Sequence, residues 1–138
     1  GTQIPYRVTA MIELPAACYQ AEGIANFVDG FSFGTNDLAQ TTYGFSRTDL
    51  TRMFGQYRNR GILEKSPFVS LTDPLLEIIR VGVERGRQGN SRLQIGICGE
   101  QAGDPDSVKK CYELGMDYAS CSPLRVPFIY QAFQRGAQ

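Results

Sequence analysis

Three polar side chains of different kinds follow one another where an apolar run ends, in the stretch "FSFGTNDLAQ". Thr35, Asn36 and Asp37 come directly after Gly34. A strand end that serves only as a turn more often carries Gly, Pro or a single capping Asp. A hydroxyl, an amide and a carboxylate in a row indicate a binding site, where backbone amides after the glycine also face an anionic ligand. The alternative is an ordinary Asx turn, which is at least as common.

A second carboxylate, Glu13, lies near the end of the run "RVTAMIEL". If the two runs are neighbouring parallel strands, Glu13 and Asp37 come within reach of one cation. Two carboxylates, with the other positions left to water and substrate oxygens, are typical of Mg²⁺, which stabilises an enolate as a Lewis acid. The opposing interpretation pairs Glu13 with an arginine and makes Asp37 a helix cap. Spacing alone does not separate the two.

The chain contains four cysteines, at positions 18, 98, 111 and 121. Cys121, in "SCSPLRVP", lies at the tip of the last predicted strand, where a thiol can act as a general acid. Most cysteines only fill space in a core, so packing is the competing interpretation. Cys98, in "GICGE", sits earlier in its strand and is expected to be more buried. Cys18 and Cys111 fall within predicted helices and are expected in the core.

Composition excludes several kinds of protein. Histidine is absent, which rules out Ser-His-Asp and Cys-His catalysis and histidine metal sites. The 14 basic and 14 acidic residues balance, so no net field favours nucleic acid or a membrane surface. Arg47 and Arg125 either face an anion or are solvated. The cysteine spacing matches no zinc ribbon, and no secretory signal is visible, so we expect reduced thiols and a cytoplasmic location.

A strand-then-helix rhythm runs along the whole chain. Strands are predicted over residues 7–14, 30–34, 93–99 and 117–122, and helices over residues 16–28, 48–60, 74–88, 104–114 and 126–136. Consecutive βα units imply an α/β fold with parallel strands and right-handed crossovers. These units fit a small open sheet or half of an eight-fold barrel, and in both folds the ligand edge is the carboxyl end of the strands.

Some helix boundaries are predicted from single residues. Gly23 is a weak point in the first helix, Thr48 or Asp49 begins the second, and Asp73 with Pro74 forms a cap and first turn for the third. The chain begins with Gly1 rather than Met, so we expect a processed product, an engineered chain or a piece of something larger.

Five motifs together resemble one family. The stretches "TAMIELPAA", "FSFGTNDLAQTTYGFSRTD", "GILEKSPFVSL", "IGICGEQAGDPDSV" and "GMDYASCSPLRVP" are similar to the carboxyl-terminal phosphoenolpyruvate-binding region of the pyruvate phosphate dikinase family. They occur in that family's order and span almost the whole chain. Phosphoenolpyruvate synthase and phosphotransferase enzyme I share the Gly-Thr/Ser-Asn-Asp theme but diverge around "SCSPLRVP".

The resemblance implies a fold and a set of partners. The family's catalytic domain is a (β/α)₈ TIM barrel, of which residues 1–138 would supply the C-terminal half. The remaining barrel half, the phosphohistidine domain and the ATP-binding domain would lie elsewhere in the parent chain. The family's barrel also contributes to homodimer contacts. A plant or algal parent would be plastid rather than cytoplasmic.

The resemblance also implies roles for particular side chains. The matching Mg²⁺ ligands are Glu13 and Asp37, the substrate-binding turn is Gly34, Thr35, Asn36 and Asp37, and the matching thiol that protonates the pyruvate enolate carbon is Cys121. The intact enzyme would convert ATP, phosphate and pyruvate to AMP, diphosphate and phosphoenolpyruvate.

This chain departs from the family pattern at two places. Gln101 and Ala102 stand where the family usually has a histidine and a glycine, and Ala16 replaces an arginine after the proline. The family's substrate-clamping arginines lie in the missing barrel half. We therefore expect the isolated chain to be inactive and prone to self-association through unpaired strand edges.

Two alternatives remain open from the sequence. The chain could be a fragment of a phosphoenolpyruvate synthase or of phosphotransferase enzyme I. It could also be a non-catalytic dimerisation module, although retention of Glu13, Asn36, Asp37 and Cys121 together argues against a decayed site.

Overall fold

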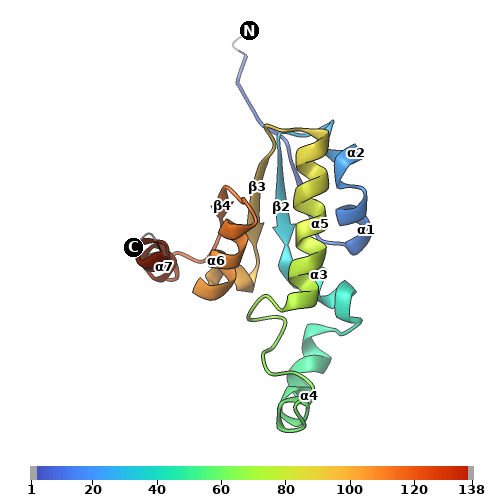
Figure 1. Cartoon of the computed structure of the whole chain (residues 1–138), viewed down its shortest axis with the longest axis vertical. Coiled ribbons are helices and arrows are strands. Elements are labelled where there is room, and N and C mark those ends of the chain that lie inside the picture. The colour runs from blue at the N-terminus through green and yellow to red at the C-terminus, as the bar shows by residue number, and fades with distance from the viewer. Residues whose placement is uncertain (1–2, 137–138) are drawn as a thin grey trace.

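Four parallel strands pair in the order in which they occur along the chain (Figure 1). The computed structural model describes residues 3–136, and its strands are β1 (Thr9–Ile12), β2 (Gly30–Gly34), β3 (Gln94–Cys98) and β4 (Tyr118–Ala119). Each strand pairs only with its sequence neighbours within this sheet. Right-handed crossovers that always step in one direction place the helices on one face, as in part of a (β/α) barrel. The predicted α/β class is confirmed.

The helices form one layer over the sheet and extend past its carboxyl end (Figure 1). They are α1 (Pro15–Tyr19), α2 (Ala21–Ala25), α3 (Thr35–Tyr43), α4 (Arg47–Asn59), α5 (Asp73–Gly89), the 3₁₀ helix η1 (Glu100–Gly103), α6 (Pro105–Glu113) and α7 (Val126–Gly136). The long helix α5 runs alongside β2, whereas α3 and α4 lie beyond the carboxyl end of β2 (Figure 1). Helix α4 buries one residue, Leu50, whereas α5 buries five.

Several predicted boundaries are wrong. The first predicted helix is two short helices that meet at Gln20, whose backbone N–H closes α1 on Ala16 and Ala17, and Gly23 lies inside α2. The second predicted helix begins earlier because Ser46 accepts a hydrogen bond from the Asp49 backbone N–H at 3.0 Å.

Other differences concern the ends of strands. Strand β1 is shorter than predicted, and β4 is reduced to a two-residue ladder with β3. The N-cap of α5 is Thr72 rather than Asp73. The sequence patterns missed α3 and η1, which directly follow β2 and β3.

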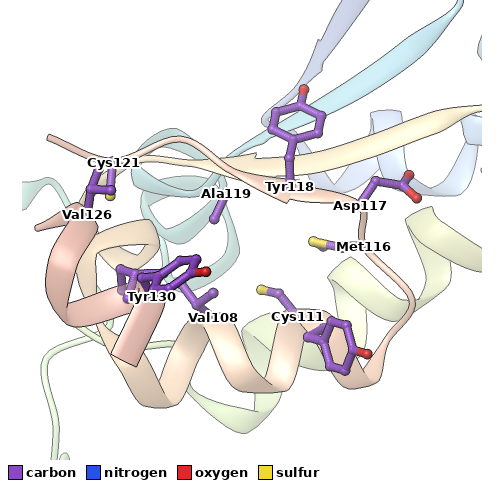
Figure 2. A pocket seen from close by; sticks show the side chains of 11 residues that line it. Val108, Cys111, Met116, Asp117, Tyr118, Ala119, Cys121, Val126 and Tyr130 are labelled. Atoms are coloured by element: carbon purple, nitrogen blue, oxygen red, sulfur yellow. The ribbon is translucent and has the colours of Figure 1, made fainter. Parts of the chain in front are cut away.

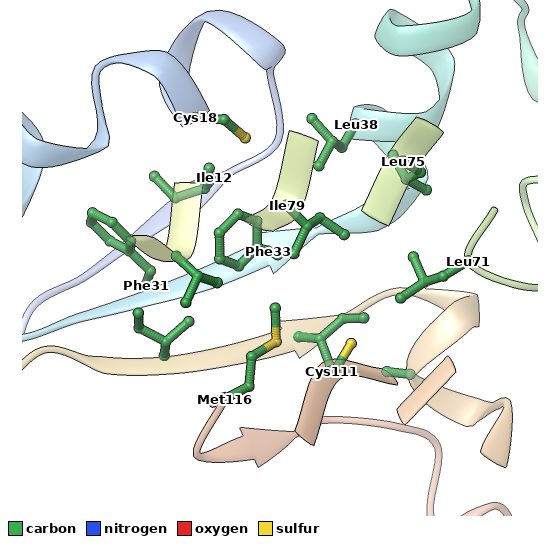
Figure 3. Packing of buried hydrophobic residues seen from close by; sticks show 14 of the residues in the cluster. Ile12, Cys18, Phe31, Phe33, Leu38, Leu71, Leu75, Ile79, Cys111 and Met116 are labelled. Atoms are coloured by element: carbon green, nitrogen blue, oxygen red, sulfur yellow. The ribbon is translucent and has the colours of Figure 1, made fainter. Parts of the chain in front are cut away.

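The core lies between the sheet and the helix layer (Figure 3). Phe31 and Phe33 of β2 are fully buried and face α5. Helix α5 comes close to these rings because it presents glycines to them: a Cβ on Gly82 would lie 2.9 Å from the Phe33 ring, and a Cβ on Gly86 would lie 2.7 Å from the Phe31 ring. The Phe31 and Phe33 rings of β2 therefore pack directly against the α5 backbone at these two glycines.

The opposite face of the sheet carries no helix among the described residues, and we call it the open face. Met11 is 51% exposed there. The ring of Tyr118 lies flat against Gly96 on this face, and its hydroxyl donates to the Phe31 carbonyl at 3.2 Å. In a closed barrel, the face without helices is the interior.

Within residues 3–136, no helix is both long enough and apolar enough to cross a membrane.

Two glycines of helices offer a matched test of the α5 contact. Gly86→Ala should lower the free energy of unfolding by about 1–3 kcal/mol, since the added methyl group overlaps the Phe31 ring. Gly55→Ala, where a Cβ meets nothing within 4 Å, should raise it by about 0.5–1 kcal/mol. Urea denaturation of both variants measures the difference. Equal effects of the two substitutions would contradict the close packing of α5 on β2.

Candidate functional site

Glu13 and Gly34 meet at the carboxyl ends of β1 and β2. The strands pair with Ile12 opposite Phe33, so Glu13 follows β1 beside the last residue of β2. A Cβ on Gly34 would lie 2.9 Å from Glu13 Oε2 and 3.0 Å from Glu13 Cβ, so the glycine lets the Glu13 side chain approach this strand end closely. Among the described residues no ion pair reaches Glu13, so the arginine alternative is not observed.

The Thr35–Asp37 segment is the first turn of α3 rather than an isolated Asx turn. Gly34 is the N-cap, and no side chain caps this helix. The exposed Asp37 carboxylate accepts a hydrogen bond from Gln40 Nε2 at 2.9 Å, and the half-buried Asn36 Oδ1 accepts one from the Glu100 backbone N–H at 3.3 Å. The proposed alternative in which Asp37 caps the helix is therefore wrong, since Asp37 lies within its first turn.

Thr35, the first residue of α3, is buried against the segment that follows β3. Its Oγ1 lies 2.7 Å from the Cys98 carbonyl oxygen and 2.7 Å from Gln101 Oε1. Gly99, between those two residues, has φ of 101°, and a Cβ on it would lie 2.5 Å from Thr35 Oγ1. Glycine is required there by both its backbone conformation and the close approach.

Cys98 lies beside Gly34 on the open face. The two residues are paired in the sheet register. The Cys98 thiol is 3.7 Å from Met11 Sδ and 3.5 Å from the Phe33 carbonyl oxygen, and Met11 Sδ is in turn 3.0 Å from where a Gly34 Cβ would be. Cys98 and Cys121 are both half-buried, so the expected greater burial of Cys98 is not observed.

Cys121 lies two residues beyond β4, on the side of the strand that faces the helices. Figure 2 shows it beside Val126, on the same side as Ala119 and opposite Tyr118. These residues line an apolar cavity of about 500 Å³ between β4, α6 and α7. Cys121 also packs against the edge of the core. Its placement at a strand tip is as predicted, but it points mainly away from the open face.

A second, polar cavity of about 680 Å³ lies at the carboxyl edge of β3 and β4. Asn36, Cys98 and Cys121 line it, together with Arg47 and Arg125. An exposed ion pair of 3.1 Å between Arg47 and Glu100 crosses part of its rim. Of the predicted site residues, the cavity thus brings together Asn36 and Cys121. Glu13, Gly34, Thr35 and Asp37 are not among its lining residues.

The two remaining thiols belong to the core, as predicted. Cys18 and Cys111 are fully or almost fully buried. Burial raises the pKa of the Cys18 thiol to about 12 and that of the Cys111 thiol to about 12. Both groups therefore stay protonated and chemically inert over the physiological range.

The donor set fits a hard divalent cation better than a transition metal. Within residues 3–136, no three Cys, Asp or Glu side chains gather as a metal cluster. Glu13 and Asp37 would thus supply two carboxylates, and water and ligand oxygens would complete the shell, as Mg²⁺ accepts.

The sequence alone missed Gln101 as a structural part of this site. Its signal was present only as a departure from the family pattern. The helical start at Thr35 was also detectable, because "TNDLAQTTY" is followed by Gly44, which ends α3 in the left-handed conformation with φ of 66°.

The parallel sheet and the polar turn at its carboxyl edge are features of phosphoenolpyruvate-binding barrels, and residues 1–137 match the family model described as "PEP-utilising enzyme, PEP-binding domain". The chain therefore belongs to the family of PEP-utilising enzymes.

Individual relatives show which members of this family the chain resembles. The chain is 51% identical over 128 residues to a pyruvate, phosphate dikinase of Rhizobium meliloti (strain 1021), a match that covers 92% of this chain and 14% of that protein. It is 42% identical over 138 residues to the pyruvate, phosphate dikinase of Clostridium symbiosum, covering 99% of this chain and 16% of the relative. The dikinase of Giardia intestinalis is 46% identical over 128 residues, covering 92% of this chain and 14% of that protein. The chain thus spans about one seventh of the length of these curated relatives.

The burial of the four thiols predicts how they react. A disulfide reagent such as DTNB should modify Cys98 and Cys121 in the native chain, and Cys18 and Cys111 only after denaturation. Only the thiolate reacts with the reagent. Because the pKa of the Cys18 thiol and that of the Cys111 thiol are both about 12, raising the pH to 9 should not make either thiol reactive. Mass spectrometry of labelled peptides reads out each site. Rapid native labelling of Cys18 or Cys111 would contradict the core described above.

Proposed function

We propose that this chain is the phosphoenolpyruvate- and pyruvate-binding part of a pyruvate phosphate dikinase and forms the C-terminal half of its barrel. The observation that carries this proposal is the close approach of the Glu13 carboxylate to Gly34, at neighbouring strand ends and next to the polar first turn of α3. This close approach places a carboxylate at the edge where ligands bind in parallel sheets. The name of the relatives, pyruvate, phosphate dikinase, supports the reaction class.

In this proposal, Glu13 and Asp37 hold Mg²⁺. When bound, the ion would supply a positive charge that stabilises the enolate oxygen of pyruvate. Glu13 directly follows β1 and Asp37 lies in the first turn of α3, so the β1–β2 pairing determines where the two carboxylates lie. Asp37 is exposed and bonded only to the neutral Gln40 amide, which leaves its charge available to a cation.

Gly34, Thr35, Asn36 and Asp37 form the proposed substrate-binding turn. Their backbone N–H groups belong to the unpaired first turn of a nine-residue helix, where a small anionic ligand is stabilised. Asn36 faces the polar cavity, and its amide nitrogen is free to donate while its oxygen is held by Glu100.

A proton donor at carbon is also needed, and two thiols line the polar cavity. In this proposal the donor is Cys121, which the family resemblance assigns and which lines that cavity together with Asn36 and Arg125. Cys98 is the competing candidate, because its sulfur lies on the open face beside Gly34. A thiol is a suitable general acid when it stays protonated until the enolate forms.

Other parts would complete the enzyme. The open face and the free edges of β1 and β4 suit the remaining barrel half, and the phosphohistidine and ATP-binding domains would deliver the phosphoryl group. A homodimer and a cytoplasmic or plastid location remain part of the proposal. The isolated chain would be inactive because it lacks both the phosphoryl donor and the other half of the site.

Metal-dependent ligand binding tests the proposal directly. Calorimetry with oxalate, a mimic of the enolate, should detect binding with Mg²⁺ present and none without it. Asp37→Asn should weaken binding by about tenfold or more, because one anionic ligand is lost. Asp106→Asn, an exposed aspartate at the start of a different helix, should leave affinity unchanged. Binding that is indifferent to Mg²⁺ and to Asp37 would refute the proposed metal site.

A domain exchange separates the two thiols. This chain would replace the corresponding region of the Rhizobium meliloti dikinase, and phosphoenolpyruvate formation would be followed. Loss of the proton donor should reduce kcat by about 10²–10⁴. We expect that loss for Cys121→Ser and a much smaller effect for Cys98→Ser. The reverse result would move the assignment to Cys98. Turnover of the full-length parent without phosphate would favour a phosphoenolpyruvate synthase.

A further inference from the structure

Gln101 is a fully buried polar side chain with no obvious reason to be polar. It is 0% exposed and lies in η1, between β3 and α6. Burial of a primary amide is unfavourable unless both of its ends find partners. An apolar residue of similar volume would fill the same space, so the amide itself must contribute something that packing does not.

Both ends of the amide are bonded to separate parts of the site. Gln101 Nε2 donates to the Pro67 carbonyl at 2.6 Å, and Gln101 Oε1 lies 2.7 Å from Thr35 Oγ1. The orientation is fixed, because a carbonyl cannot donate and a reversed amide would place two oxygens in contact at Pro67. The Thr35 hydroxyl has one proton, which it shares between Gln101 Oε1 and the Cys98 carbonyl.

These two partners belong to two segments of the chain that line the polar cavity. Thr35 begins the turn that holds Asn36 and Asp37. Pro67 lies between Ser66 and Phe68, which line the polar cavity. A second bond, from the Glu100 backbone N–H to Asn36 Oδ1, joins η1 to the same turn. Gln101 is therefore the one described side chain that bonds both to the first turn of α3 and to the loop between α4 and α5.

We propose that Gln101 is a positioning residue that fixes the Thr35–Asn36 turn against the loop around Pro67 and so sets the affinity of the site for a small dicarboxylate or phosphorylated enol acid. This inference rests on the proposed function for the identity of the ligand, but not for the positioning itself. Gln101 acts through Thr35 and touches no ligand.

A carboxyl group at position 101 converts this role into a pH-dependent signal. In Gln101→Glu, a protonated acid can donate to Pro67 and accept from Thr35, as the amide does. An ionised one has only acceptors, and so repels the Pro67 carbonyl. Burial raises a carboxyl pKa, so the protonated form persists well above the ordinary range and the bonds are lost as the pH rises through that raised value. The charged groups on the surrounding segments are Asp37, Arg47, Lys65, Glu100, Asp104 and Arg125, and none of them bonds to the Gln101 side chain.

The first measurement needs no ligand. Amide hydrogen exchange would report the protection factor of Glu100 N–H, which is bonded to Asn36. In Gln101→Glu that protection should match the unsubstituted chain at pH 5 and fall about tenfold by pH 8. Gln101→Met should lose it at both values. If Gln101→Met does not fold, the pH comparison in Gln101→Glu still decides the matter. Unchanged protection in folded Gln101→Glu at both pH values would overturn the proposal.

The second measurement is oxalate affinity with Mg²⁺ on the same chains. Affinity of Gln101→Glu should be near that of the unsubstituted chain at pH 5 and about tenfold weaker at pH 8. Ser107→Ala is the matched control, because Ser107 is also a buried polar residue, 1% exposed, but bonds to Leu71 and Asp104 instead of the turn. It should change neither readout. An equal loss in Ser107→Ala would show a general loss of stability and overturn the positioning role.

The two proposals fail separately. Absence of oxalate binding in the unsubstituted chain would count against the proposed function of the isolated chain. The protection of the Glu100 amide would still confirm or overturn the role of Gln101.

Discussion

Phe31 and Phe33 occupy the space that two glycines leave on α5, and this packing holds the central strand in place. The rest of the sheet is aligned by it, because β1 and β3 both pair with β2. Once β2 is fixed, Gly34 lies beside Glu13 on one side and Cys98 on the other. The position of the carboxyl edge thus depends on how closely α5 approaches the same strand at Phe31 and Phe33. A change in the core at α5 would be transmitted to the site through one strand.

The open face carries different kinds of side chain from the face that the helices cover. One side of the sheet has a complete apolar core, and the other carries a flat tyrosine, a thioether, a thiol and a carboxylate. All-parallel sheets occur almost only with both faces covered, whereas this one has one face without helices among the described residues. The mixed character of this face, together with strand order, agrees with part of a barrel interior.

Much of the architecture was predictable because its signals are local. The apolar period of α5, the extended run 30–34 and the cap at Asp104 each depend on neighbouring residues, and the structure confirms them. The side of a strand on which a thiol lies depends on register, which a sequence shows poorly when β4 is only two residues long. For this reason the orientation of the Cys121 side chain could not be predicted from the sequence. Gln101 was beyond reach because its partners, Thr35 and Pro67, are more than 30 residues away.

Helix α4 is held to the rest of the structure by little buried surface, which affects how fast a ligand exchanges with the polar cavity. It buries Leu50 alone, extends beyond the carboxyl end of the sheet (Figure 1), and is joined to η1 by the exposed Arg47–Glu100 pair. Segments with little buried surface open locally at a much smaller free energy than the whole fold. Arg47 and Thr51 of α4 line the polar cavity, so its local opening would give solutes a path to the cavity. The rate at which a ligand enters and leaves the cavity would then depend on the local opening of α4. The sheet, which positions the residues of the site, would stay folded.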